Sequence, residues 1–169
     1  MKTLVLLRGN SGSGKTTVAK LLQDNYVGRA LLISQDVVRR EMLRVKDTPG
    51  NQAIGLLQLL VEYGSRSREI TILEGILYTE LYGELFRTVR ECFGSRVFAY
   101  YFDISFEETL SRHSQRSLAG EFGESEMRRW WREKDCLSDI PEQIVTAGQS
   151  AEETVARIVR DIETGYTGR

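Results

Sequence analysis

The feature that most constrains this chain is a glycine-rich loop that directly follows an apolar run. Residues 3–8, TLVLLR, favour a β-strand, and the loop RGNSGSGKTT occupies residues 8–17. The segment behind it, TTVAKLLQ, has the apolar periodicity of a helix, which we predict over about 14–25. A strand, a glycine turn and a helix in immediate succession place the loop backbone where a strand end meets a helix N-terminus.

The loop satisfies the Walker A pattern G-x-x-x-x-G-K-[ST] at Gly9, Gly14, Lys15 and Thr16. Glycines let successive backbone N–H groups point inward around phosphate oxygens, and the following helix presents its positive end to the same anion. The lysine ammonium can reach the β- and γ-phosphates, and the threonine hydroxyl can bind Mg²⁺. We therefore predict ATP and Mg²⁺ as ligands. The predicted phosphate contacts are Gly9, Asn10, Ser11, Gly12, Ser13, Gly14, Lys15, Thr16 and Thr17. The alternative is a glycine-rich turn that binds nothing.

Composition narrows the class of protein. The 169 residues, 41% hydrophobic and 28% charged, are typical of a single globular domain spanning residues 1–169. Lys and Arg number 23 against 24 Asp and Glu, and this near-neutral balance mildly disfavours long nucleic acid as a partner. Two cysteines and one histidine argue against a disulfide framework and a Cys/His metal site. No apolar run approaches the roughly 20 residues that span a bilayer, so we expect a soluble, cytoplasmic protein without a membrane partner.

Four more apolar runs alternate with helical patterns, which predicts a parallel α/β sheet covered on both faces. The further strands are expected at 30–34, 69–75, 96–103 and 142–147. Helices are expected at about 36–45, 51–65, 78–92 and 125–135, with two more beginning after Ser105 and Ser150. Each of these serines has a glutamate three residues on, Glu108 and Glu153, in the spacing of a capping box.

Acidic residues follow the second and third strands, and ligands of open parallel sheets bind at these strand ends. Asp36 can accept the proton of a substrate hydroxyl that attacks the γ-phosphate, although it can alternatively cap the next helix. Arg39 and Arg40 can bind a phosphate or carboxylate of an acceptor, or be solvated helix charges. Glu74 ends the third strand at a Walker B position and can serve the metal, the acceptor or both; Glu there departs from the commoner Asp.

The polar stretch 114–124, SQRSLAGEFGE, lies between two helical patterns and predicts a lid at about 114–126. Arg112 and Arg116 are four residues apart and share the helix face that leads into it. Arginines on a lid can close over the nucleotide and neutralise charge on the transferred group, so we predict catalytic roles for them. A salt-bridged surface helix is the alternative.

Two later segments add candidates. Trp130 and Trp131 are adjacent and cannot both face the core, so we expect one to pack and the other to line an acceptor cleft. The neighbouring Arg128 and Arg129 are further lid candidates. After the fifth strand, Gly148 permits close backbone approach to the adenine.

With these residues in place, the chain resembles the small P-loop kinases, and most closely the group of the polynucleotide 5′-hydroxyl kinase domain, zeta-type toxins and chloramphenicol phosphotransferase. The segments GNSGSGKT, ISQDVVRREM and DISFEETLSRHSQR carry the resemblance. It implies that Asp36 is the base, that Arg39 contacts the acceptor, and that Arg112 and Arg116 are lid arginines. It also implies a three-layer α/β/α P-loop NTPase fold with five parallel strands in the order 2-3-1-4-5. ILEGIL resembles the third strand of uridine-type kinases as well.

We therefore predict a kinase that transfers the γ-phosphoryl of ATP to a hydroxyl of a small molecule, a nucleoside or a nucleic-acid end. A GTPase is disfavoured because REKD at 132–135 lacks the Asn of the guanine motif N-K-x-D. An oligomeric motor ATPase is disfavoured because the chain is short for one. An ATP-binding regulatory NTPase without an acceptor remains the alternative, since no motif identifies the acceptor.

Overall fold

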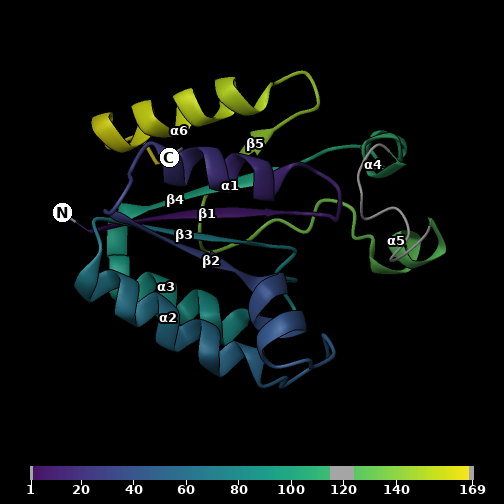
Figure 1. Ribbon diagram of the computed structural model, residues 1–169, viewed down its shortest axis with the longest axis horizontal. Helices are drawn as coiled ribbons and strands as arrows, with labels where there is room; N and C mark the ends of the chain where they lie inside the picture. The colour runs from purple at the N-terminus through teal and green to yellow at the C-terminus, as the bar shows by residue number, and fades with distance from the viewer. Residues whose placement is uncertain (1, 115–123, 168–169) are drawn as a thin grey trace.

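Five parallel strands form the central sheet, and strand β1 (Thr3–Gly9) occupies its middle (Figure 1). The structure, a computed structural model, describes residues 2–114 and 124–167. The other strands are β2 (Ala30–Ser34), β3 (Ile70–Gly75), β4 (Val97–Phe102) and β5 (Glu142–Val145). Their order is β2-β3-β1-β4-β5, and every neighbouring pair is parallel. The predicted strands and the order implied by the resemblance are confirmed.

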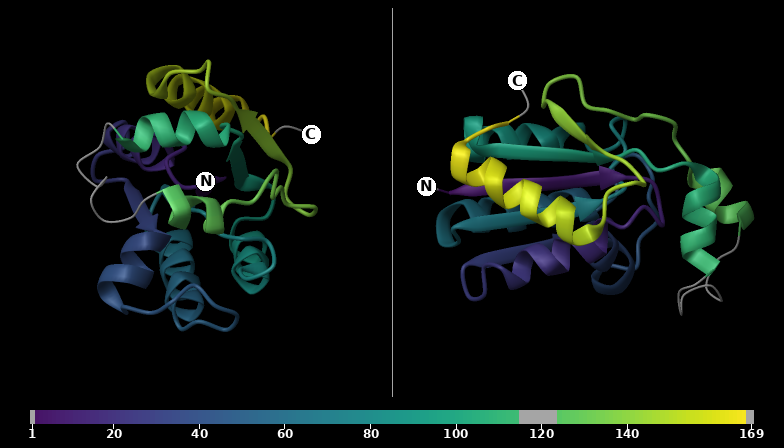
Figure 2. Two further views of the ribbon diagram at one scale, coloured as in Figure 1. Left: turned by 90° about the vertical axis from the view of Figure 1, so that its right-hand side faces the viewer. Right: turned by 90° about the horizontal axis from the view of Figure 1, so that it is seen from above.

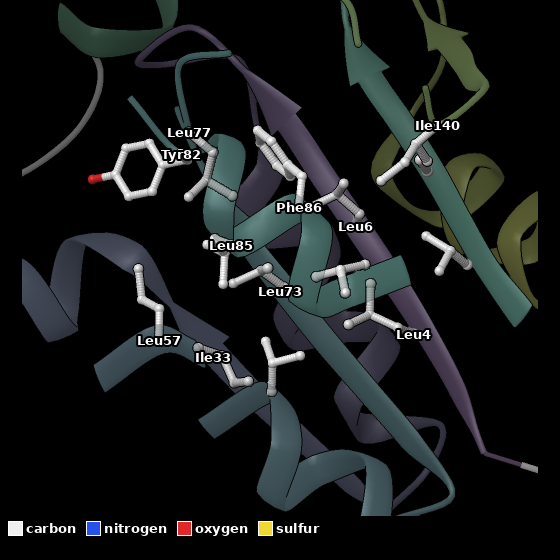
Figure 3. Packing of buried hydrophobic residues seen from close by; sticks show 14 of the residues in the cluster. Leu4, Leu6, Ile33, Leu57, Leu73, Leu77, Tyr82, Leu85, Phe86 and Ile140 are labelled. Carbon is white, nitrogen blue, oxygen red and sulfur yellow. The ribbon is translucent and has the colours of Figure 1, made fainter. Parts of the chain in front are cut away.

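Helices cover both faces of the sheet, which explains why the central strands are apolar without alternation. Helices α1 (Lys15–Asp24) and α6 (Ala151–Thr164) cover one face, and α2 (Ala53–Ser67) and α3 (Gly83–Phe93) cover the other (Figure 1). Leu4 and Leu6 of β1 belong to the core beneath α2 and α3 (Figure 3). Val5 and Leu7, which point the opposite way, belong to the core beneath α1 and α6.

The shorter helical elements gather at the carboxyl ends of the strands. They are the π-helix η1 (Val37–Met42) after β2, helix α4 (Phe106–Ser114) after β4, and helix α5 (Glu124–Trp130). Figure 2 shows α4 and α5 together beyond the strand ends. A 3₁₀ turn, η2 (Gly94–Arg96), lies at the opposite end of the strands and leads into β4. The strand ends that carry the predicted site residues therefore open toward a layer of short helices.

Two helices are shorter than the sequence predicts, because long-range bonds hold the backbone outside a helix. Helix α3 begins at Gly83 and not near residue 78, since both the backbone N–H and the hydroxyl of Thr79 donate to Asp135. Helix α5 ends at Trp130 and not near residue 135, since the backbone of Arg132 bonds to a distant side chain, as described below. The helix expected over 36–45 is the shorter η1.

The two predicted serine caps are present. At α6, the Glu153 N–H donates to Ser150 Oγ at 3.1 Å, and the Ser150 N–H donates to Glu153 Oε2 at 2.8 Å, which completes a capping box. At α4, the Glu108 N–H donates to Ser105 Oγ at 3.3 Å.

Among the helices that the structure describes, none is both long and apolar enough to span a bilayer.

Candidate active site

The glycine-rich loop connects β1 to α1 and has the backbone that only glycines adopt easily. Gly9, Gly12 and Gly14 have φ angles of 140°, 76° and 100°. A Cβ atom on Gly9 would also lie 2.8 Å from the carbonyl oxygen of Phe102, at the end of the neighbouring strand β4. Glycine at this position is therefore required both by the backbone conformation and by the close approach of β4.

Lys15 is the first residue of α1 and is almost fully buried within the loop. Its Nζ donates to the carbonyl oxygen of Asn10 at 2.7 Å and to Ser13 Oγ at 3.2 Å. These bonds hold the ammonium inside the curve of the loop, where the sequence predicts the β- and γ-phosphates. A buried ammonium in this position is suited to binding a polyphosphate.

Glu74 lies beside Thr16, as expected for a shared metal site. Glu74 ends β3, next to β1, and its Oε2 accepts a 3.2 Å bond from the Thr16 hydroxyl. Its Oε1 accepts a 2.5 Å bond from the hydroxyl of Ser34, which ends β2. Hydroxyl and carboxylate oxygens suit Mg²⁺, which usually takes one or two protein ligands together with phosphates and water. Ser34 is a neighbour of this site that the sequence did not indicate.

The composition of this site suits Mg²⁺ better than a metal held entirely by protein. Within residues 2–114 and 124–167, no cluster of three or more His, Cys, Asp and Glu side chains could enclose a cation. Thr16 and Glu74 thus fit an ion that completes its shell with phosphate oxygens.

A cavity of about 690 Å³ lies next to the loop and is a candidate for an acceptor site. It is lined by Ser11, Asp36, Arg39, Arg40, Lys46, Asp47, Thr48, Pro49, Ile76, Tyr78, Glu80, Leu81, Arg129, Trp130 and Arg132. These residues come from the glycine-rich loop, from η1 and the loop after it, from the segment between β3 and α3, and from α5 and the residues after it. The predicted acceptor residues Asp36, Arg39 and Arg40 therefore meet in one cavity, while Glu74 lies beside Thr16 and outside the lining of that cavity.

Asp36 precedes η1, but its side chain makes no capping hydrogen bond. Instead its Oδ1 accepts a 3.0 Å bond from the guanidinium of Arg39, and about half of the carboxylate side chain is exposed, 53%. Arg39 also donates to the carbonyl oxygen of Val45 at 3.3 Å, so it is held on both sides. Both partners of this pair line the cavity, and the capping alternative receives no support.

Two adjacent pairs follow the predicted lid, Arg128 with Arg129 and Trp130 with Trp131. In each pair one side chain packs against Phe106 and the other lines the cavity. Trp131 packs edge-to-face against Phe106 of α4, with ring centroids 5.2 Å apart, and the Arg128 guanidinium lies 4.4 Å from the same ring. Trp130 and Arg129 instead line the cavity. One tryptophan thus packs and the other borders the open space, as the sequence predicts.

Asn10 has a role that the Walker A pattern does not suggest. Its side-chain amide donates to the Arg132 carbonyl oxygen at 2.6 Å and accepts from the Arg132 N–H at 3.0 Å. Nearby, the Tyr78 hydroxyl donates to the Trp130 carbonyl oxygen at 2.7 Å. Burial raises the pKa of Tyr78 to about 12, so its hydroxyl keeps its proton near neutral pH and remains a donor. The Asn10 bonds attach the segment just after α5 to the glycine-rich loop, and the Tyr78 bond attaches the end of α5 to the segment between β3 and α3.

Arg8 is a second residue that the sequence analysis missed. It is fully buried at the end of β1, and its guanidinium donates to Glu142 at 2.9 Å, to Asp135 at 3.0 Å and to the Leu77 carbonyl oxygen at 2.8 Å. Burial raises the pKa of the Glu142 carboxyl, while the Arg8 charge opposes that rise. The only signal in the sequence was one charged residue in an otherwise apolar strand.

A smaller cavity of about 170 Å³ lies on the other side of the loop, between α1 and the start of α6. Thr146 and Gln149 are among its lining residues, and Gln149 Oε1 accepts a 3.1 Å bond from the Thr146 N–H. This bond closes a turn with Gly148 near its tip. Gly148 itself is not one of the described residues that line this cavity. The predicted contact of Gly148 with the adenine stays a prediction.

The predicted lid arginines receive no test from the structure. Arg116 lies outside the described residues, as does most of the lid expected at 114–126. Arg112 belongs to α4, but its side chain is also outside the description. The described parts of α4 and α5 lie close to the glycine-rich loop. A Cβ atom on Gly12 would lie 3.1 Å from the Thr109 carbonyl oxygen and 3.5 Å from the Met127 side chain.

Comparison with known proteins places the chain in a family. Residues 4–137 match the model of the AAA domain family, and the chain therefore belongs to that family. A search of curated proteins finds no match.

Solved structures with the same fold include several small kinases. A gluconokinase from Sinorhizobium meliloti 1021 has a TM-score of 0.68 at 18% identity, with 97% of this chain and 95% of that chain covered. The Mycobacterium tuberculosis APS kinase in complex with AMPPNP and APS has a TM-score of 0.67 at 18% identity, with 96% of this chain and 98% of that chain covered. The Acinetobacter baumannii shikimate kinase in complex with shikimate has a TM-score of 0.61 at 17% identity, with 100% of this chain and 97% of that chain covered. These likenesses show the P-loop fold; the narrower resemblance to polynucleotide kinases and zeta-type toxins stays a prediction.

Proposed function

We propose that this protein is a kinase that transfers the γ-phosphoryl group of ATP to a hydroxyl of a small molecule. The observation that carries the proposal is the 690 Å³ cavity beside the glycine-rich loop, with Ser11 of the loop and Asp36 in its lining. An ATPase that only hydrolyses or senses ATP does not need a cavity of ligand size at this position. The AAA domain family match is compatible with either activity, so the cavity favours the transferase.

The nucleotide side of the site has the groups that the proposal needs. Lys15 and the loop N–H groups would bind the phosphates, and Thr16 and Glu74 would hold Mg²⁺ beside them. When bound, Mg²⁺ neutralises charge on the phosphate oxygens. The similar APS kinase, solved with AMPPNP, supports a nucleoside triphosphate as the donor.

Asp36 acts as the general base of the proposed reaction. It accepts the proton of the acceptor hydroxyl as the hydroxyl oxygen bonds to the γ-phosphorus, and the bond from that phosphorus to the β,γ-bridging oxygen breaks to release ADP. The Arg39 guanidinium, 3.0 Å from the carboxylate, holds it in the direction of the cavity. Arg112 and Arg116 would neutralise charge on the transferred group from the lid side.

The acceptor that fits is a small molecule. The cavity has the volume of sites for metabolite-sized ligands, which usually measure about 300–1,000 Å³. The similar solved structures include kinases named for gluconate, APS and shikimate, which supports this class of acceptor. A nucleoside fits within the same volume, and a nucleic-acid end would enter only by its terminal nucleotide.

The proposal is tested by incubating the protein with γ-³²P-labelled ATP, Mg²⁺ and a library of small hydroxyl compounds. We expect one class of compound to gain label and to raise ADP release above the rate without acceptor. Release of ADP that no compound increases, with label only in inorganic phosphate, would instead favour a regulatory NTPase.

The lid arginines are tested by the double variant Arg112→Ala, Arg116→Ala. We expect ATP binding to remain and transfer to fall, because positive charge near the γ-phosphate acts mainly in the transition state. Full phosphotransfer by the double variant would remove both residues from the mechanism.

A further inference from the structure

The cavity beside the glycine-rich loop carries an excess of positive charge that the chain as a whole does not. The chain has a formal net charge of −1. Among the described residues that line the cavity, the cationic side chains are Arg39, Arg40, Lys46, Arg129 and Arg132, and the acidic ones are Asp36, Asp47 and Glu80. A local excess of cations in a concave site attracts anionic ligands and repels cationic ones.

Each of the three carboxylates already has a partner within the protein. Asp36 accepts from Arg39 at 3.0 Å, and Glu80 lies 3.7 Å from the guanidinium of Arg132. The remaining carboxylate, on Asp47, accepts a 2.6 Å bond from the hydroxyl of Tyr82. Asp36 and Glu80 therefore each offset one arginine, while Asp47, whose partner is a neutral hydroxyl, keeps its negative charge. Five cationic side chains against three carboxylates leave the described lining with a net positive charge.

The remaining cations come from different parts of the chain. Arg40 lies on η1, Lys46 lies in the loop after it, and Arg129 lies on α5. All three border the same cavity, and Asp36, the proposed base, directly precedes η1. A ligand that places its hydroxyl near Asp36 would thus have positive side chains around its other end.

We propose that the acceptor carries an anionic group in addition to its reactive hydroxyl, and that Arg40, Lys46 and Arg129 recognise it. This inference rests on the proposed kinase function and specifies its substrate class as a hydroxylated carboxylate, sulfate or phosphate ester. Apolar side chains, among them Trp130 and Leu81, also line the cavity and would contact the carbon skeleton. Neutral polyols and aminated acceptors lack the group that the cations would bind.

The test compares acceptors that share one skeleton and differ in one anionic group. Glucose, gluconate, glucose 6-sulfate and glucose 6-phosphate form one set, and uridine and uridine 5′-monophosphate form a second. Binding is measured by calorimetry with ADP and Mg²⁺ present, and transfer is measured from γ-³²P-labelled ATP. We expect the anionic members of at least one set to bind and to be phosphorylated, and the neutral member of that set to do neither.

Variants identify the side chains responsible. Arg129→Gln and Lys46→Gln should each weaken binding of the anionic member by about 10- to 100-fold, because a charged hydrogen-bond partner is lost. Arg129→Lys, which retains the charge, should recover part of the loss. Arg66→Gln makes the same change of net charge on α2, at a residue whose side chain is 74% exposed and absent from the cavity lining, and should leave binding unchanged.

The outcomes separate this inference from the function on which it rests. Equal binding of neutral and anionic members, or equal weakening of both by Arg129→Gln, would overturn the anion site. Binding of anions that depends on Arg129 without any transfer of label would leave the anion site standing and overturn the kinase.

Discussion

The two sides of the candidate site are built in different ways. The phosphate side is one continuous stretch, residues 9–17, whose shape is set by glycines at positive φ and by the start of α1. The acceptor side is assembled from residues 36–49, 76–81 and 129–132, which meet only in the folded chain. A site of the first kind is a local motif, and a site of the second kind exists only through tertiary structure.

This difference separates what the protein shares with its relatives from what is particular to it. Backbone N–H groups and one lysine bind a phosphate chain whatever the acceptor is. The cavity, in contrast, depends on the side chains that three distant segments contribute. The fold is shared with kinases of about 17–18% identity, and a fold by itself does not fix the acceptor.

The largest effect should follow from a change on the phosphate side. Lys15→Ala removes the buried ammonium that the loop encloses, so we expect ATP binding to weaken and transfer to fall at least about 10³-fold. The measurements are ATP affinity by calorimetry and label transfer. Lys20→Ala changes an exposed lysine on the same helix and should behave as wild type; normal turnover by Lys15→Ala would show that the loop is not the phosphate site.

The matching change on the acceptor side should separate binding from chemistry. Asp36→Asn retains the size and polarity of the side chain but loses its basicity, so ATP affinity should persist while transfer falls about 10²-fold or more. Glu41→Gln, at an exposed acidic residue on η1 five positions further along the chain, is the control. Transfer at the wild-type rate by Asp36→Asn would mean that another group accepts the proton.

Arg8 lies where the two sides meet, so its loss should lower the stability of the fold more than it changes the rate of transfer. Arg8→Met leaves the carboxylates of Asp135 and Glu142 without their buried counter-charge, and we expect unfolding free energy to drop by about 3–5 kcal/mol. Urea denaturation measures the change. Arg29→Met breaks an exposed pair with Glu69 and should cost less than about 1 kcal/mol; similar losses for both variants would contradict the structural role of Arg8.

Glu74→Gln tests whether the metal belongs to the phosphate side. The amide keeps the shape but removes the negative charge, so the Mg²⁺ concentration for half-maximal transfer should rise about 10- to 100-fold. The acceptor KM should stay within about threefold, since Glu74 bonds Thr16 and Ser34 and does not line the cavity. A change confined to the acceptor KM would show that Glu74 serves the acceptor and not the metal.

Asn10→Ala should give the smallest effect and tests whether the two sides are coupled. It removes both bonds to the Arg132 backbone, so the segment that carries Trp130 loses its attachment to the loop. We expect the acceptor KM to rise about tenfold with a smaller change in the ATP KM. Asn25→Ala, which removes one bond at the far end of α1, is the control; a rise only in the ATP KM would refute the coupling.

The predictions from sequence succeeded where neighbouring residues decide the structure. The strands, the Ser150 capping box and the glycine conformations of the loop all depend on local pattern. The helix ends at Gly83 and Trp130 were wrong by several residues, since bonds to Asp135 and Asn10 override helix propensity there. Asp36, Arg39 and Arg40 do line one cavity, because they follow a strand end at the edge of the sheet where the ends of parallel strands meet, while their roles stay predictions.

The sequence by itself therefore determined the glycine-rich loop between β1 and α1 and the order in which strands and helices alternate. These follow from residue spacing and backbone preference, which act over short distances along the chain. Only the tertiary structure decided which side chains border the candidate acceptor cavity, that Asn10 attaches the segment after α5 to the loop, and that Arg8 forms ion pairs with Asp135 and Glu142. Those contacts join residues up to 134 positions apart, and their partners are selected by sheet pairing and helix packing, which no local pattern records.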